Sequence, residues 1–233
     1  MSILKKALSL ATILALVSTA ARADIIDFVE LTEGAGQKGE SAWSTLNIAG
    51  SDFNLAITAT QDSDDAFAYL DWNHAGLGVC GDVDNTGAHP GSHGNVCNPG
   101  SDDNVTTGEM LYFTFDANVT IERIWFNNTH DADGVISSPE YIMINGSPVP
   151  GPGNGYATGN SYNNNAALSA DAGNFLGPYG AIAGTAFTIG FGDEQFYVSG
   201  MQVRATTVPE PGTLALLGIG LMGMGAARRR KKI

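Results

Sequence analysis

Short segments in the middle of the chain alternate apolar and polar side chains, and clusters of Gly, Asn and Asp separate them. The segments 53–58 and 119–124 show this alternation. A β-strand with one buried face and one hydrated face has this period of two, because successive side chains point to opposite faces. No long segment has the period of a helix. We therefore expect strands at 25–31, 43–49, 53–60, 66–72, 109–115, 119–126, 141–145, 185–191 and 195–205.

These strands predict an all-β fold, and more specifically an antiparallel β-sandwich of jelly-roll type. Two long segments interrupt the strand pattern, at 73–107 and 145–184, and both are rich in Gly and Asn. Loops of this length are uncommon in compact domains and are usually functional or poorly ordered. The sequence thus predicts one β-sandwich domain over residues 24–207, about 184 residues, with long Gly/Asn-rich loops.

The two ends of the chain differ in composition from this middle. Residues 1–23 combine two lysines, an apolar run and a final Ala-Arg-Ala, which predicts a secretory signal peptide cleaved after Ala23. Residues 208–233 begin with Pro209, Glu210 and Pro211 and continue into an apolar stretch at 213–227. That stretch is shorter than the ~20 residues of a relaxed membrane-spanning helix, so it predicts a short transmembrane helix at most. The basic tail after it, which favours the cytoplasmic side, is Arg228, Arg229, Arg230, Lys231 and Lys232.

This C-terminal order of a Pro-Glu-Pro triplet, a short Gly-rich apolar helix and a basic cluster resembles the PEP-CTERM sorting signal of exported bacterial proteins. The same kind of tail is also labelled an ice-binding protein C-terminal domain, a label that describes the tail and not an ice-binding face. The resemblance covers residues 208–233. It implies an exported protein, often from a producer of biofilm or exopolysaccharide, whose tail passes through the membrane and is processed by an exosortase-type membrane protease. It implies nothing about the middle domain.

Charge narrows the possible partners of the middle domain. Residues 24–207 contain only Lys38, Arg123 and Arg204 as cations against 23 acidic residues, a formal charge of −20. Proteins that bind nucleic acid through its phosphates need clustered Lys and Arg, so no nucleic-acid partner is expected. Cations and neutral polar ligands are the electrostatically compatible partners.

Cys80 and Cys97 are the only two cysteines, and both lie in the first long polar segment. In an oxidising compartment outside the cytosol they are expected to form a disulfide. The alternative is a metal site shared with His89 and His93, but the spacing lacks the close cysteine pairs of zinc sites.

Acidic clusters in the polar segments make Ca²⁺ the metal to consider, because it prefers carboxylate and carbonyl oxygens. The segment 82–87 starts like an EF-hand loop, but His93 stands where that loop needs its last Glu. The alternative is that these residues are solvated turn residues. The candidate calcium ligands are Asp82, Asp84, Asp102 and Asp103.

No catalytic motif of a hydrolase or a metalloprotease occurs in the chain. We therefore expect an exported cell-surface or extracellular-matrix protein with a non-enzymatic adhesin or glycan-associated domain. The alternatives are a secreted polysaccharide hydrolase that uses a pair of loop carboxylates, and a purely structural matrix protein. The distance between two carboxylates would separate the first alternative from the others, and it depends on the fold.

Overall fold

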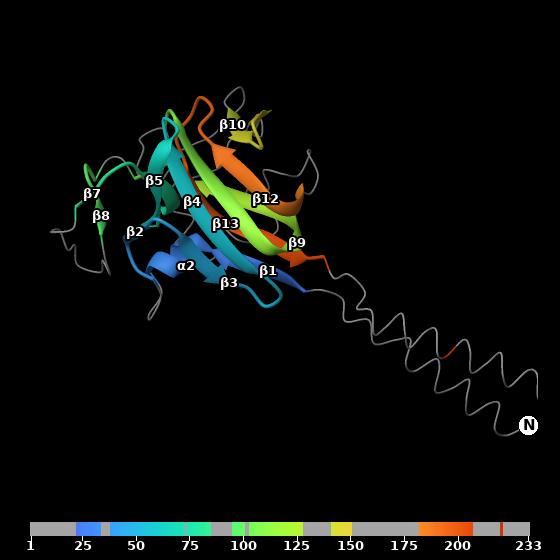
Figure 1. Ribbon diagram of the computed structural model, residues 1–233. Coiled ribbons are helices and arrows are strands. Elements are labelled where there is room, and N and C mark those ends of the chain that lie inside the picture. The colour runs from blue at the N-terminus through green and yellow to red at the C-terminus, as the bar shows by residue number, and fades with distance from the viewer. Residues whose placement is uncertain are drawn as a thin grey trace, which may run out of the picture. The chain divides into compact units, whose positions relative to one another are not determined.

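The computed structural model describes residues 22–33, 38–72, 74–84, 95–100, 103–127, 141–150, 182–206 and 220. A compact unit spans Ala23–Ala205, and all strands lie within it (Figure 1). The expected signal peptide before Arg22 and the sorting tail, apart from Gly220, lie outside the described residues.

The unit is built almost entirely of β-strands, which confirms the all-β prediction. Its one helix with described bounds, α2, is short, and the strands are connected by turns or by segments outside the described residues. In chain order the elements are β1 (Ala23–Asp27), α2 (Phe28–Glu33), β2 (Ser41–Trp43), β3 (Leu46–Ala49), β4 (Asn54–Gln61), β5 (Asp64–Asp71), β6 (Gly76–Cys80), β7 (Val83–Asp84), β8 (Val96–Cys97), β9 (Glu109–Asn127), β10 (Tyr141–Ile144), β11 (Ser147–Pro150), β12 (Ile182–Gly190) and β13 (Tyr197–Ala205).

Eleven strands form one continuous sheet in which the paired strands run antiparallel, and β13, β6, β5, β4 and β9 close it into a ring. The ring closes because β9 changes neighbours along one edge. Residues 109–115 pair with β4, whereas residues 119–127 pair with β13. The opposite edge of β9 pairs with β12. The predicted jelly-roll sandwich of two sheets is therefore not confirmed, since the described strands form a closed five-stranded barrel with extra strands attached.

The length of β9 is the main departure from the predicted strand pattern. We expected two strands, 109–115 and 119–126, but β9 runs without a break through both. The backbone N–H and the side-chain amide of Asn54 donate to the Asp116 carboxylate at 2.7 and 2.6 Å. These bonds lower the pKa of Asp116 and hold the chain extended at the point where β9 changes its partner.

The predicted strand at 25–31 is partly wrong, because the chain turns into α2 at Phe28. The Asp27 carboxylate accepts the backbone N–H groups of Val29 and Glu30, at 3.1 and 2.9 Å, and so caps the first turn of the helix. Phe28 is completely buried, and α2 lies against β5, β6 and β13. The alternating pattern in the sequence could not distinguish this short helix from a strand.

The predicted first long loop at 73–107 contains β6, which is a member of the closed ring. Gly76 and Gly78 made this segment resemble a loop, but both glycines are needed by the packing. A Cβ at Gly78 would lie only 1.9 Å from the backbone oxygen of Asp103, which crosses over β6 at that point. The other corrections are smaller: 43–49 is divided into β2 and β3 by a bend at Ser44, and β11 lies in the predicted second loop.

The core inside the ring consists of aliphatic and aromatic side chains that face inward from every ring strand. In the same cluster Phe113 of β9 stacks on Phe187 of the neighbouring strand β12, with ring centroids 4.4 Å apart. Both rings are buried. Other fully buried members of this cluster are Leu46, Ile57, Leu70, Leu77, Leu111, Ile189, Val198 and Val203.

Replacing Phe113 by Ala is expected to lower the free energy of unfolding by about 3–5 kcal/mol, because it leaves a cavity in the buried core. Thr114→Ala, at the next position on the exposed face of β9, should change it by less than about 0.5 kcal/mol. Urea titrations of both variants, fitted with a common m-value, check the difference. Equal losses would show that Phe113 does not pack as described.

Candidate functional site

The candidate site lies where β4 and β5 separate. These strands pair only between Ala59–Gln61 and Asp64–Ala66. Beyond Ala66, β5 continues with β2 as its neighbour, whereas β4 continues with β3. The bend at Ser44 joins β2 to β3 and lies in the fork between the two diverging strands. A sheet that divides in this way leaves a hollow on its outer face.

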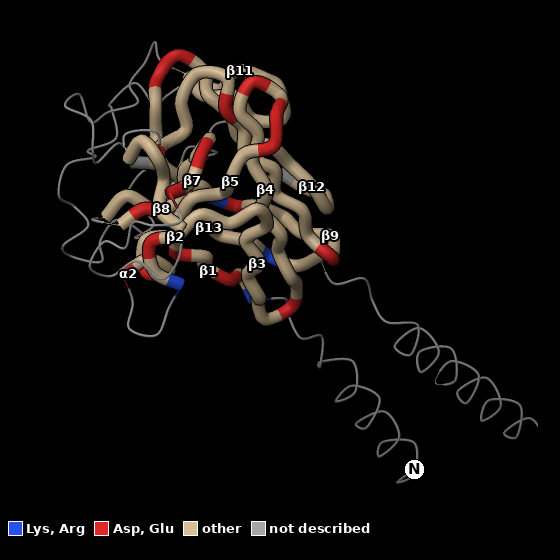
Figure 2. The backbone as a smooth tube through the Cα atoms, turned by 60° about the vertical axis from the view of Figure 1, so that its left-hand side comes forward, with Lys and Arg blue, Asp and Glu red and all other residues tan. Residues whose placement is uncertain are grey.

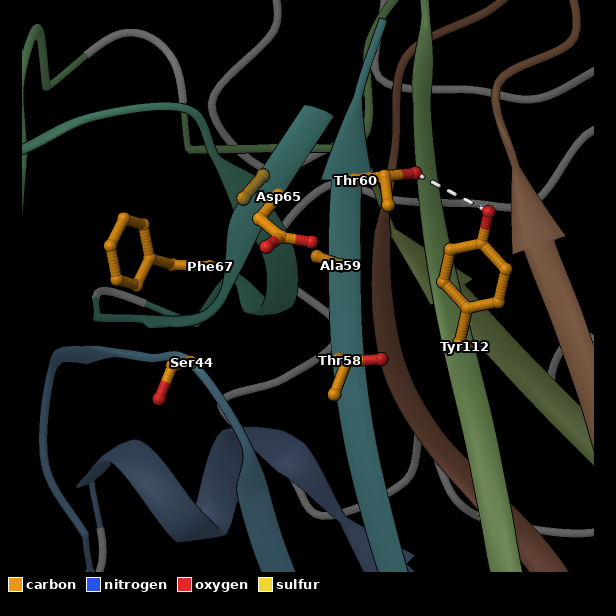
Figure 3. Close-up of a pocket in the computed structure, with 8 residues that line it drawn as sticks. Ser44, Thr58, Ala59, Thr60, Asp65, Phe67 and Tyr112 are labelled. Carbon is orange, nitrogen blue, oxygen red and sulfur yellow. Dashed lines mark hydrogen bonds between the residues drawn. The ribbon is translucent and has the colours of Figure 1, made fainter. Parts of the chain in front are cut away.

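The hollow has a volume of about 450 Å³ and is open to solvent (Figure 3). We call it the fork groove. Ala59 and Ala66, whose side chains belong to the buried core, contribute to its lining, together with polar side chains on the hydrated face of β4 and β5. Its lining residues are Ser44, Thr58, Ala59, Thr60, Asp65, Ala66, Phe67 and Tyr112.

The fork groove combines an aromatic surface with hydroxyl groups and one carboxylate. Tyr112 is 37% exposed, and the Thr60 hydroxyl donates to its phenolic oxygen at 3.4 Å. Phe67 is half-buried on the β5 side, and Figure 3 shows Asp65 between Phe67 and Thr60. Among the described residues that line the groove, Asp65 has the only ionised side chain. The groove can therefore bind a polar ligand with an apolar face.

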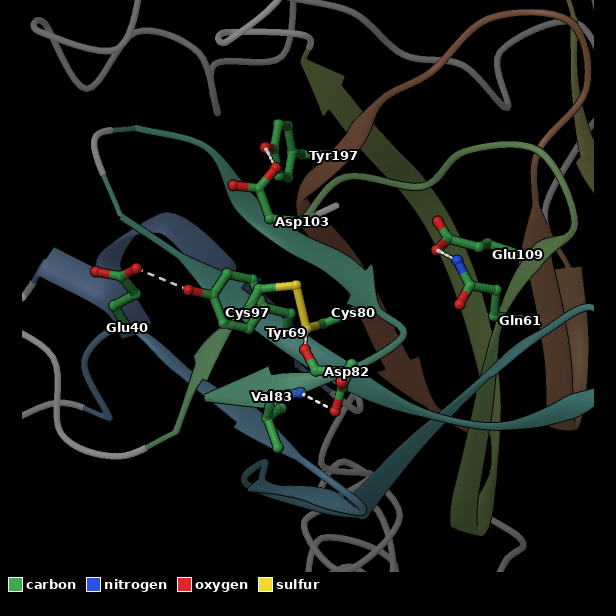
Figure 4. Close-up of a disulfide and its surroundings, with 10 residues drawn as sticks. All are labelled: Glu40, Gln61, Tyr69, Cys80, Asp82, Val83, Cys97, Asp103, Glu109 and Tyr197. Atoms are coloured by element: carbon green, nitrogen blue, oxygen red, sulfur yellow. Dashed lines mark hydrogen bonds between the residues drawn. A yellow bond between two sulfur atoms is a disulfide. The ribbon is translucent and has the colours of Figure 1, made fainter. Parts of the chain in front are cut away.

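The disulfide predicted between Cys80 and Cys97 is confirmed (Figure 4). The two Cα atoms are 5.6 Å apart, and the two-stranded β7–β8 sheet adjoins the bond. Both cysteines pack with Ala42 and Tyr69 in a small cluster separate from the main core. Closing a loop of this size stabilises a fold by roughly 3 kcal/mol in the chain-entropy model.

Beside the disulfide, two buried tyrosines donate hydrogen bonds to carboxylates. The Tyr69 hydroxyl donates to Glu40 at 2.7 Å, and the Tyr197 hydroxyl donates to Asp103 at 2.6 Å (Figure 4). Asp71, 5% exposed, adds negative charge near both phenols. Burial, and then these carboxylates, raise the pKa of both tyrosines far above the usual value. Both phenol groups therefore hold their protons more tightly in the folded protein than in the unfolded chain.

Three of the four predicted calcium ligands, Asp82, Asp84 and Asp103, lie among the described residues. Asp103 is engaged by Tyr197, and the exposed Asp82 carboxylate accepts the backbone N–H of Val83 at 2.8 Å. Asp84 lies on β7, and Asp102 is outside the described residues, as are His89 and His93. In the part of the chain that is described, no three His, Cys, Asp or Glu side chains meet in a geometry that could hold a metal. Calcium binding stays a prediction.

Sequence reasoning did not find the fork groove. The alternation on β4 does place Thr58 and Thr60 on the hydrated face, and the alternation on β9 does the same for Tyr112. Their proximity depends on the pairing of Thr58 with Tyr112 between strands about fifty residues apart. No local pattern in the sequence predicts that β4 pairs with β9.

The comparison with known families bears on the C-terminal tail. The family model of the PEP-CTERM protein-sorting motif matches residues 207–231. The chain carries a PEP-CTERM sorting motif. The resemblance found in Pro209, Glu210, Pro211 and the basic tail is thereby confirmed. No curated protein and no solved structure is detectably similar to the chain.

The PEP-CTERM motif marks an exported protein that is sorted at the membrane through its C-terminal tail, and tails of this kind are signals for exosortase processing. Among the described residues no helix is long and apolar enough to span a membrane. The expected membrane helix at 213–227 lies outside the described residues, apart from Gly220.

Because two tyrosines are buried, we expect the free energy of unfolding to fall at alkaline pH. Because the folded state raises their pKa, their contribution is complete below the unfolded pKa of about 10 and is lost as the pH rises above it. The urea midpoint should therefore fall steeply between about pH 10 and 11. Tyr69→Phe and Tyr197→Phe should each be less stable at pH 8, by about 1–3 kcal/mol, since a carboxylate loses its donor. Each should also lose less stability between these two pH values than the parent protein, and an unchanged slope would contradict the role of the phenols.

Proposed function

We propose that this PEP-CTERM protein is displayed on the cell surface or released into the extracellular matrix, where its β-domain binds polysaccharide through the fork groove without catalysing a reaction. The single observation that carries the proposal is the composition of the groove. It offers an exposed tyrosine ring next to threonine and serine hydroxyls and one carboxylate. Sugars present an apolar ring face and several hydroxyls, so aromatic stacking and hydrogen bonds to hydroxyls match both parts of such a ligand.

Binding is favoured over hydrolysis for a geometric reason. Glycoside hydrolysis uses two carboxyl groups, about 5–10 Å apart, that flank the bond to be cleaved. The described lining of the fork groove offers only Asp65. A purely structural matrix protein remains the contrasting hypothesis, and a groove with no measurable affinity for any sugar would support it.

The proposed destination follows from the tail. An exosortase-type membrane protease is the partner that a PEP-CTERM motif supports. We expect the exported protein to have lost Arg228–Lys232 in a host with this protease. Intact-mass measurement of surface and secreted fractions checks the loss, and the same host without the protease gene is the control. Recovery of the full tail on the exported protein would contradict this part of the proposal.

Substitutions in the groove test the binding function. Tyr112→Ala should reduce retention on a column of the host's own exopolysaccharide at least tenfold, since a stacked ring is a dominant contact at such sites. The matched control is Trp72→Ala, because Trp72 is also exposed, at 48%, but does not line the groove. Release of reducing sugar by the parent protein would support the hydrolase alternative. Equal retention of both variants and the parent would contradict a groove-based site.

A further inference from the structure

We propose that the fork groove binds a sugar unit that carries an ammonium group, as found in polymers of deacetylated amino sugars. The inference rests on the proposed function of the groove and adds the chemical class of its ligand. It depends on three features: the charge of the domain, the position of Asp65, and the aromatic rings on either side of it.

The charge of the domain disfavours the common acidic polysaccharides. The domain has 23 acidic residues and three Lys and Arg residues, and Figure 2 shows the acidic positions spread over the chain. Arg204 forms an ion pair with Glu122 at 2.7 Å, and the Lys38 ammonium lies 4.8 Å from the centre of the Trp43 ring. None of the residues that line the fork groove is Lys, Arg or His. A uronate or sulfate group would therefore meet repulsion without a local cation to offset it.

Asp65 is placed to receive a cation. Its side chain is exposed on the outer face of β5, opposite Thr60 of β4. It lies next to the β4–β5 turn, where the exposed residues Asp62 and Asp64 add to the negative potential. An ammonium donor gives a carboxylate a charge-assisted hydrogen bond, which is roughly twice as strong as a neutral one. The Thr60 and Ser44 hydroxyls at the groove supply acceptors for the remaining N–H groups.

The aromatic rings favour the same ligand. Tyr112 and Phe67 belong to the two sides of the groove, on β9 and β5. A ring face attracts both the C–H face of a sugar and an adjacent ammonium group. A neutral N-acetyl group keeps the stacking but loses the charge. The inference therefore predicts a specific order of affinities: the free amine binds more tightly than the acetamide, and the acetamide more tightly than the carboxylate sugar.

The test is isothermal titration of the exported protein with three hexasaccharides of equal length, made of glucosamine, N-acetylglucosamine or galacturonic acid. We expect glucosamine to bind at least about threefold more tightly than N-acetylglucosamine, in line with one exposed ion pair, and galacturonic acid not to bind. Asp65→Asn should weaken glucosamine binding about threefold more than it weakens N-acetylglucosamine binding. The matched control is Asp52→Asn, which removes one exposed carboxylate from the turn before β4, outside the groove.

The outcomes separate this inference from the proposed function. Equal affinity for the glucosamine and N-acetylglucosamine chains would overturn the inference and leave polysaccharide binding intact. An equal effect of Asp65→Asn and Asp52→Asn would also overturn it, because the attraction would then come from the total charge. Failure of every hexasaccharide to bind, together with unchanged retention of Tyr112→Ala on the native polysaccharide, would overturn both.

Discussion

The fold depends on one strand changing its partner. Along one edge β9 pairs first with β4 and then with β13, and the change takes place at Asp116, where Asn54 holds the carboxylate with two hydrogen bonds. Because the same edge serves two neighbours, the sheet returns on itself and the ring of five strands closes. The five strands of a closed ring all have neighbours on both edges, which disfavours edge-to-edge pairing with strands of other chains.

Closure also explains where the polar groups lie. The inward faces of the ring are occupied by the apolar core, so functional side chains must stand on the outer face. One part of that face, around β5, β6 and β13, carries the buried residues Tyr69, Asp71 and Tyr197 next to the half-buried Asp103. Another part, where β4 and β5 separate, stays open and forms the fork groove. The same sheet thus carries a sealed polar cluster and an accessible site.

Lys and Arg residues are scarce in the domain and frequent in the sorting tail. With three Lys and Arg among 23 acidic residues, the domain has few ion pairs with which to balance its charge. Tyrosine hydroxyls serve as donors to Glu40 and Asp103 instead, at the cost of a dependence on pH in alkali. Five of the eleven Lys and Arg residues of the chain lie in the C-terminal tail, in and next to the matched sorting motif.

The sequence alone determined the features that rest on local order. Alternation located β4, β5, β10 and β13 to within a few residues, the order of triplet, apolar stretch and basic cluster identified the sorting motif, and the isolation of Cys80 and Cys97 paired them. Tertiary structure decided everything that depends on which strands become neighbours. It incorporated the glycine-rich β6 into the ring, converted Phe28–Glu33 into a helix, and brought Tyr112 beside Thr58 to form the groove. The physical reason is that a pleated strand specifies which side chains share a face, whereas the choice of partner strand is made by core packing between residues far apart in the chain.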